Sequence, residues 1–274
     1  MGRIIAQDVD FSYHTEKVLQ GLSLTIQEND FACILGESGC GKSTFLRLLA
    51  GLQFPDSGSI TVDGVPVQKP GMDRAVVFQD YGLYPWMTTG KNILICMKQK
   101  YPDKKNAELN EVIRYYLNQV GLDSSVYNKY PMELSGGMRQ RCAICRAFAM
   151  DAPILLMDEP FGALDAVTRF RLQDMTLNLC SHEGKKKSVV FVTHDVEEAM
   201  YLSTKIFVLG MKPSKVIFTY EFKDKRLEPR DRVELFKQDE YVELQKNLMR
   251  VLNQNIRERI EEHEKKIVST VSGR

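Results

Sequence analysis

The most restrictive feature of this sequence is the segment Gly36-Glu-Ser-Gly-Cys-Gly-Lys-Ser43. The short apolar run Phe31–Leu35 precedes it, and the helix-forming stretch STFLRLLAGL overlaps its end. The pattern G-x-x-x-x-G-K-S between a buried strand and a helix start predicts a phosphate-binding loop. A simple glycine turn before a helix is the alternative, and the flanking strand and helix argue against it. The chain is therefore expected to be an α/β protein that binds a nucleotide.

The residue types of this loop suit a phosphate group. Glycines allow successive backbone N–H groups to turn toward one anion, and the helix start adds partial positive charge. Lys42 is expected to reach the terminal phosphates, and Ser43 to offer its hydroxyl to magnesium. The nucleotide-binding residues predicted here are Gly36, Glu37, Ser38, Gly39, Cys40, Gly41, Lys42, Ser43 and Thr44.

A second apolar run, Ile154–Met157, ends in the acid pair Asp158 and Glu159. Successive side chains of a strand point to opposite faces, so the two carboxylates can do different work. We expect Asp158 to hold magnesium and Glu159 to polarise the attacking water as a general base. A solvated acid pair at a strand end is the alternative, and the phosphate-binding loop favours the catalytic interpretation.

Two more polar residues follow buried runs. His194 comes after Ser188–Thr193, and Gln79 comes after the run AVVF that begins at Ala75. A lone histidine at a strand end is usually structural. Open parallel sheets, however, bind ligands at the carboxyl ends of their strands, and four polar strand ends are hard to explain by packing alone.

The order of apolar patterns predicts the fold class. Buried runs that alternate with helices indicate a mostly parallel sheet covered on both faces. Residues 3–30 alternate apolar and polar side chains, which indicates antiparallel strands, and residues 80–150 have a helical pattern. We therefore expect an α/β P-loop NTPase core with a mostly parallel sheet, an antiparallel β subdomain and a helical subdomain at about 80–150. The chain is charged and helical from residue 231 onward.

Composition excludes some classes of protein. The formal net charge is +1, which gives no electrostatic reason to expect nucleic acid as a partner. The sequence has no run of ~18 apolar residues and no apolar signal core, so we expect the protein to stay on the side where it is made. The six cysteines form no framework, and the Cys142–Cys145 pair lacks the second pair of a zinc site.

The motif that identifies a family is LSGGMRQR, which begins at Leu134. Ser135 is a good N-cap for the following helix, and Gly136 and Gly137 leave backbone N–H groups open. Taken by themselves, the serine and the two glycines could be an ordinary helix N-cap with no binding role. The motif follows a phosphate-binding loop by about 90 residues and precedes ILLMDEP, and that order resembles the ATP-binding cassette (ABC) proteins.

This resemblance, which covers about residues 3–252, implies roles for further residues. Tyr13 resembles the aromatic residue that stacks on adenine, and Gln79 resembles the glutamine that contacts metal and water. His194 resembles the histidine that contacts the terminal phosphate, and Ala163–Asp165 the loop that contacts the opposite subunit. In the family two cassettes face head to tail, so that each ATP lies between one phosphate-binding loop and the partner's Ser135–Gly137 segment.

Several stretches are similar to the cassettes of nitrate, sulfonate and taurine importers. They include DYGLYPWMTTGKNI after Gln79 and HDVEEAMYLSTKIFVL from His194. Importers of thiamine precursors and riboflavin carry similar cassettes, which leaves the cargo open. The resemblance implies ATP and Mg²⁺ as cofactors, a homodimer, two transmembrane permease subunits and, indirectly, a substrate-binding protein. It also implies a cytoplasmic location on the inner face of the membrane. We expect an ABC ATPase domain at 1–252 and a charged helical tail at 253–274.

Three further hypotheses concern single features. The loop Tyr81–Met87 is expected to form the socket for a membrane-subunit helix, unless its rings pack inside the helical subdomain. Cys40 at a helix start is expected to react with thiol reagents, unless it is a buried filler. The apolar stripe of the tail, which runs from Leu244 to Ile260, either docks on its own domain or adds a dimer contact.

Two other functions fit the sequence less well. A cassette of DNA repair or translation usually carries zinc insertions, coiled coils or two cassettes, and the sequence has none of these. A P-loop kinase or GTPase would lack LSGGMRQR and would not need His194. The sequence therefore favours the ATPase of an importer.

Overall fold

Six strands form the larger sheet, in the order β10-β9-β3-β8-β7-β6. The computed structural model describes residues 2–162, 164–181, 187–224 and 227–272. Only β10 and β9 pair antiparallel, and the other neighbours are parallel, so the mostly parallel sheet is confirmed. The strands are β3 (Phe31–Leu35), β6 (Arg74–Val77), β7 (Ile154–Asp158), β8 (Ser188–Thr193), β9 (Lys205–Leu209) and β10 (Val216–Glu221). The central strands β3, β7 and β8 are buried at every position, as expected of strands covered on both faces.

A second sheet has four antiparallel strands in the order β2-β1-β4-β5. Its strands are β1 (Ile4–Tyr13), β2 (Glu16–Ile26), β4 (Ser57–Val62) and β5 (Val65–Pro66). The helix α1 (Lys42–Leu49) packs its apolar side chains into a core shared with both sheets. The expected antiparallel β subdomain is therefore confirmed, and it holds α1, the helix that follows the phosphate-binding loop, against the main sheet.

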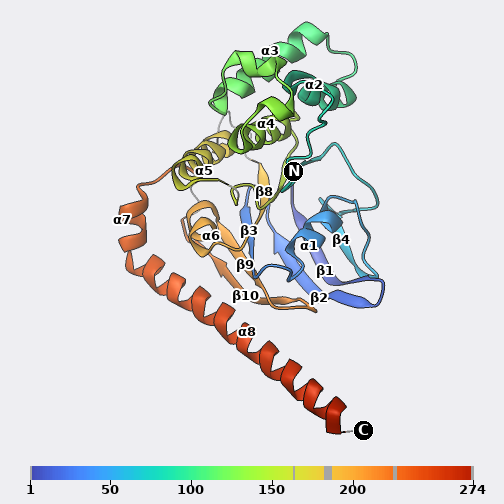
Figure 1. The fold of residues 1–274 in the computed structure, drawn as a ribbon, viewed down its shortest axis with the longest axis vertical. Coiled ribbons are helices and arrows are strands. Elements are labelled where there is room, and N and C mark those ends of the chain that lie inside the picture. The colour runs from blue at the N-terminus through green and yellow to red at the C-terminus, as the bar shows by residue number, and fades with distance from the viewer. Residues whose placement is uncertain (1, 163, 182–186, 225–226, 273–274) are drawn as a thin grey trace.

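The helices between β6 and β7 stand apart from the two sheets (Figure 1). They are α2 (Thr89–Lys100), α3 (Asn106–Gln119) and α4 (Gly136–Ala149), with two short 3-10 helices at Ser124–Asn128 and Pro131–Glu133. This confirms that the stretch at about 80–150 is helical. The buried face of α4 belongs to the same apolar core as β7 and β8, which connects the helical part to the larger sheet.

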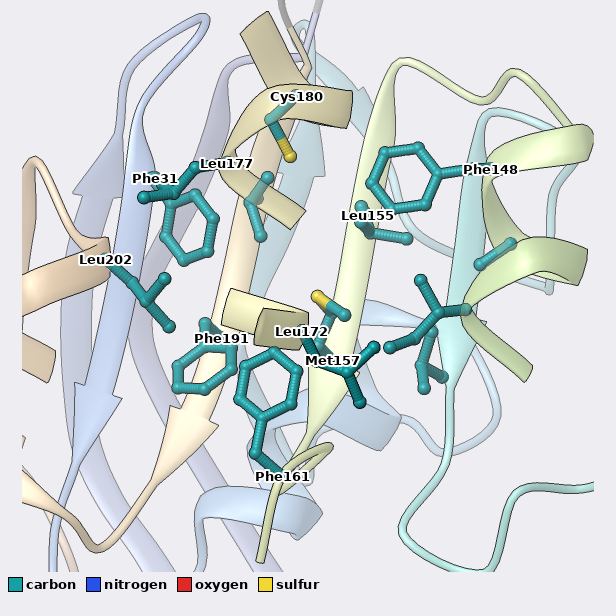
Figure 2. Packing of buried hydrophobic residues seen from close by; sticks show 14 of the residues in the cluster. Phe31, Phe148, Leu155, Met157, Phe161, Leu172, Leu177, Cys180, Phe191 and Leu202 are labelled. Atoms are coloured by element: carbon teal, nitrogen blue, oxygen red, sulfur yellow. The ribbon is translucent and has the colours of Figure 1, made fainter. Parts of the chain in front are cut away.

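One face of the larger sheet is covered by α5 (Ala166–Ser181) and α6 (Val196–Leu202). Figure 2 shows Leu172 and Leu177 of α5 beside Phe31 and Phe191 of the sheet, with the ring of Phe161 next to Phe191. The ring centroids of Phe161 and Phe191 are 5.6 Å apart. The loop that follows the acid pair is thus anchored in the core.

The C-terminal part consists of α7 (Arg232–Lys237) and the long helix α8 (Asp239–Ser272). Leu244, Leu248 and Leu252 are buried against the body, which confirms docking for this part of the apolar stripe. Asn255 still accepts a hydrogen bond from the Met211 N–H, and the end of the helix then extends away from the body (Figure 1). Since α8 runs unbroken through residue 252, the proposed division into 1–252 and 253–274 stays a prediction, and residues 273–274 lie outside the described residues. None of the described helices is long and apolar enough to cross a lipid bilayer.

Candidate functional site

The loop between β3 and α1 has the backbone that its glycines predict. Gly39 has a φ of 80° and Gly41 a φ of 110°, which is the left-handed region that side chains rarely adopt. At Gly36 a Cβ atom would lie 2.8 Å from the Cys40 sulfur and 3.0 Å from the Leu209 carbonyl oxygen. The loop therefore fits tightly against β9, and Gly36 is required for that close approach.

Lys42 is the buried cation of this loop, with 3% of its surface exposed. Its Nζ donates hydrogen bonds to the carbonyl oxygens of Gly36, at 2.9 Å, and Glu37, at 3.0 Å. The same nitrogen lies 3.6 Å from Glu159 Oε1. The ammonium group is thus held at the mouth of the loop, beside a carboxylate from the end of β7.

Ser43 and Asp158 meet at the next position. The hydroxyl of Ser43 donates to Asp158 Oδ1 at 2.9 Å. Burial raises the pKa of Asp158, although the Ser43 hydrogen bond acts in the opposite direction. These two residues and Gln79 line one pocket of about 650 Å³, together with Arg47. The three residues predicted to hold magnesium therefore share one cavity.

Glu159 turns away from Asp158, as neighbouring residues at a strand end should. Its backbone has a φ of 43°, and its N–H donates to the Val192 carbonyl of β8 at 3.0 Å. Its Oε2 lies 3.2 Å from His194 Nδ1, while its Oε1 faces Lys42. The ring of His194 is half exposed. The two carboxylates thus have different surroundings, one next to a hydroxyl and one between a cation and an imidazole.

Tyr13 lies beside α1 rather than at the acid pair. Its hydroxyl exchanges hydrogen bonds with the Gln53 side chain at 2.8 to 3.0 Å, and its ring packs edge-on against Phe11 with centroids 4.9 Å apart. Burial raises the pKa of Tyr13, but hydrogen bonds from Gln53, Thr44 and Arg47 outweigh it, so the net pKa is lowered. The half-buried ring is held next to α1, the helix that follows the phosphate-binding loop.

Ser135 caps α4, and its hydroxyl accepts a hydrogen bond from the Met138 N–H at 3.3 Å. Gly136 and Gly137 form the first turn and are partly exposed. Within the described residues, no hydrogen bond or ion pair joins this segment to the phosphate-binding loop. The structure therefore brings together Gly36–Thr44, Gln79, Asp158, Glu159 and His194, while Ser135–Gly137 stands apart as a second exposed helix start.

This arrangement has the parts that phosphoryl transfer to water requires. The glycine loop and Lys42 offer donors to phosphate oxygens, and Ser43 and Asp158 offer oxygen ligands. A carboxylate and an imidazole face the same space. A pocket of similar volume, about 660 Å³, lies between α3, α4 and α5 and contains none of these residues.

Comparison with known proteins agrees with this geometry. A family model described as ABC transporter matches residues 19–162, which include the phosphate-binding loop, the LSGGMRQR segment and the acid pair. The chain belongs to this ABC transporter family. As an ABC cassette it binds ATP and is an ATPase. The fold class is thereby confirmed as that of the ABC ATPases.

Curated relatives align with most of the chain. An uncharacterized ABC transporter ATP-binding protein of Methanocaldococcus jannaschii is 41% identical over 90% of this chain and 88% of its own length. The nitrate import ATP-binding protein NrtD of Synechococcus elongatus is 41% identical over 73% of this chain and 72% of its own. Some relatives are longer, and this chain spans about a third of their length.

A solved structure shows the same fold. The dimeric structure of MJ0796, a bacterial ABC transporter cassette, superposes with a TM-score of 0.73 at 30% sequence identity. The superposition covers 81% of this chain and 99% of that one. It supports the ABC ATPase fold for most of the chain.

Sequence reasoning missed Arg146, which lies under the loop that follows Gln79. The guanidinium is buried and donates to the backbone carbonyls of Tyr81, at 3.0 Å, and Gly82. Burial lowers the pKa of Arg146. An arginine inside an apolar helix face is a signal that the sequence did contain, because such a charge needs buried partners.

The hypothesis that Cys40 is a reactive thiol assumed that the helix start stabilises its thiolate, and this assumption is wrong. Burial raises the pKa of the Cys40 thiol, and Lys42 only partly offsets this effect. The side chain is 1% exposed and lies under Gly36. The alternative of a small buried filler therefore holds, because burial outweighs the charge of the helix start.

Proposed function

We propose that this chain energises an importer of a small solute such as nitrate, sulfonate or taurine. The observation that carries the proposal is the set of contacts joining Lys42, Glu159 and His194 at the edge of a parallel sheet. The nitrate import relative and the aromatic loop of the helical part favour import over other ABC functions. We propose no nucleic acid partner, in keeping with the net charge of +1.

In this proposal each site residue has one task. Gly36–Thr44 bind the phosphates, with Lys42 moving from its own loop carbonyls to the terminal phosphate oxygens. Glu159 accepts a proton from the attacking water, and His194 contacts the terminal phosphate. Tyr13 stacks on adenine beside α1. Asp158, which accepts the hydrogen bond of the Ser43 hydroxyl, holds the magnesium ion.

The donor set fits a magnesium ion. Ser43 Oγ and Asp158 Oδ1 are 2.9 Å apart, and Gln79 lines the same pocket, so hard oxygen ligands converge there. No group of three or more His, Cys, Asp or Glu side chains suits a metal in the described part of the chain. That is expected where phosphate and water oxygens complete the shell. Bound Mg²⁺ would neutralise charge that develops on the phosphates.

We further propose that two copies close over ATP. Ser135–Gly137 forms a partly exposed helix start, where backbone N–H groups lack partners within the helix, and no hydrogen bond or ion pair joins it to its own phosphate-binding loop within the described residues. A partner copy that presents this segment to the terminal phosphate would complete the site. The dimeric MJ0796 cassette supports this arrangement.

The membrane partners are two permease subunits, with a substrate-binding protein acting through them, and the cassette binds the inner face of the membrane. The exposed rings of Tyr84 and Trp86 support a docking surface near Gln79. They are 43% and 69% exposed, and their centroids lie 5.4 Å apart. Two adjacent exposed aromatic rings are typical of an interface.

The decisive experiment is the variant Glu159→Gln. It should retain Mg-ATP binding, form an ATP-bound dimer on gel filtration and hydrolyse ATP at least ~100-fold more slowly than wild type, because the general base is lost. The variant Lys42→Met is the control that should fail to bind ATP and remain monomeric. Wild-type hydrolysis by Glu159→Gln would refute the assignment of the general base.

A further inference from the structure

Arg169 in the first turn of α5 connects two loops of the site. Its Nη2 donates to the Leu164 carbonyl at 3.2 Å, in the loop that follows the acid pair. Its Nη1 lies 3.5 Å from Asp195 Oδ2, and its Nε lies 3.9 Å from Glu198 Oε1. Asp195 directly follows His194. One guanidinium therefore contacts both the loop of Glu159 and the segment of His194.

Glu198 is the buried end of this connection. Only 6% of the residue is exposed. Its Oε2 accepts from the Thr193 hydroxyl at 2.7 Å, and its Oε1 accepts from Gln173 Nε2 at 3.0 Å. Thr193 in turn accepts from the Asp195 N–H at 3.1 Å. The carboxylate thus contacts Thr193 directly and Asp195 through Thr193, which are the two residues that flank His194. Through Gln173 it also joins them to α5.

The buried carboxylate of Glu198 and the guanidinium of Arg169 oppose a rearrangement of these contacts. A buried carboxylate needs a cation and donors, and among the neighbouring contacts only Arg169 supplies positive charge. Gln173 is 1% exposed, and its Oε1 has no hydrogen-bond partner in the described residues, nor has Arg169 Nε. A rearrangement that separated Glu198 from Thr193, Gln173 and Arg169 would leave its buried carboxylate without partners.

The distance that this cluster fixes is the one between Glu159 and His194. The two side chains come from neighbouring strand ends, and their contact is 3.2 Å. Besides the Glu159 N–H to Val192 bond, the loop after the acid pair is tied to the β8 end through Arg169. Catalytic groups that shift by about 1 Å can lose two orders of magnitude in rate.

We propose that Arg169 and Glu198 are positioning residues that set the spacing of Glu159 and His194 for ATP hydrolysis. This inference rests on the proposed roles of those two residues. It assigns no contact with ATP to Arg169 or Glu198. Their substitution should therefore lower the rate of the chemical step and leave nucleotide affinity unchanged.

The test is steady-state Mg-ATP hydrolysis by the full chain carrying Arg169→Met. We expect kcat to fall roughly 10- to 100-fold with KM unchanged, in keeping with a small displacement of catalytic groups. Arg169→Lys keeps the positive charge without the planar fork, and should restore part of the rate. The double variant Arg169→Met with Glu198→Gln should be no more than about two-fold slower than the slower single variant, because the two residues act as one unit.

Arg171→Met is the matched control, because Arg171 lies two positions further along α5 and is exposed. It should behave as wild type in kcat, KM and thermal unfolding. A wild-type kcat for Arg169→Met would overturn the proposal. So would a loss of kcat that is matched by weaker ATP binding or by an equal loss of folded protein, since that result indicates a general structural role.

The two proposals fail in different ways. If Glu159→Gln remains active, the assignment of Glu159 fails whatever Arg169→Met does. If Glu159→Gln is inactive and Arg169→Met is as fast as wild type, only the positioning role fails.

Discussion

His194 Nδ1 lies 3.2 Å from Glu159 Oε2, and the two residues come from the ends of the adjacent strands β7 and β8. The other oxygen of Glu159 faces Lys42 at 3.6 Å. One carboxylate therefore lies next to two residues that are both proposed to bind the terminal phosphate, His194 and Lys42. Loss of His194 should accordingly affect the reaction more than the binding of ATP.

The variant His194→Ala tests this relationship. We expect ATP hydrolysis to fall about 100-fold, because a donor to the terminal phosphate and a partner of Glu159 are both removed. Binding of Mg-ATP, measured by equilibrium titration, should change little, since the glycine loop and Lys42 remain. Asp195→Ala leaves the imidazole in place but removes both the cap of α6 and the ion pair with Arg169, so it separates loss of the imidazole from disturbance of the segment around it. Equal loss of rate and affinity in His194→Ala would contradict the assignment.

The pH dependence of stability should report the buried carboxylate of Glu198. Burial raises its pKa above the ordinary value of 4.5. The folded state then binds a proton more tightly than the unfolded state, so this contribution to stability is fully present below pH 4.5 and is lost as the pH rises through the folded pKa. The amide of Glu198→Gln does not titrate, so the stability of this variant has no such pH-dependent contribution. Its melting temperature relative to wild type should rise across that window, and a constant difference would contradict the burial effect.

The labelling of cysteines by a thiol reagent should follow burial. Burial raises the pKa of both thiols, so in the native protein the half-buried Cys96 should react before Cys40 because Cys40 is only 1% exposed. Unfolding in urea should make all six cysteines react. Peptide mass spectrometry after short exposure at neutral pH measures the order. Rapid labelling of Cys40, with protection by ATP, would instead restore the idea of a reactive thiol in the loop.

Trp86 offers a direct test of the docking surface, because it is the only tryptophan of the chain. Its ring is 69% exposed, so acrylamide should quench its emission efficiently in the isolated cassette. Co-purification with the permease subunits should reduce quenching and shift the emission to shorter wavelength. The variant Trp86→Phe supplies the blank. Unchanged quenching in the assembled complex would remove Trp86 from the interface.

The sequence was sufficient for the parts of the site that local rules control. The phosphate-binding loop, the divergence of Asp158 and Glu159, and the arrival of His194 at the same edge all follow from strand ends and glycine geometry. The environment of Cys40 was not predictable, because it depends on how tightly Gly36 packs on Leu209. That contact joins residues that are far apart in the sequence.

The Arg169 and Glu198 cluster escaped prediction for a similar reason. Glu198 looks like a surface residue of a short charged helix until α5 covers it. Its burial depends on the packing of α5 against the sheet, and its partners come from separate elements. Periodicity shows which face of a helix is apolar, but not which polar group the neighbouring helix will meet.

The position of Arg146 has a mechanical consequence. Ser135 begins α4 and Arg146 lies eleven residues further on, which corresponds to roughly 16 Å along the helix axis. Because Arg146 donates hydrogen bonds to the backbone carbonyls of Tyr81 and Gly82, a displacement of that loop would pull on α4. α4 would then transmit a movement of the aromatic loop to its N-terminal end. There Ser135–Gly137 would contact the nucleotide bound by the partner copy.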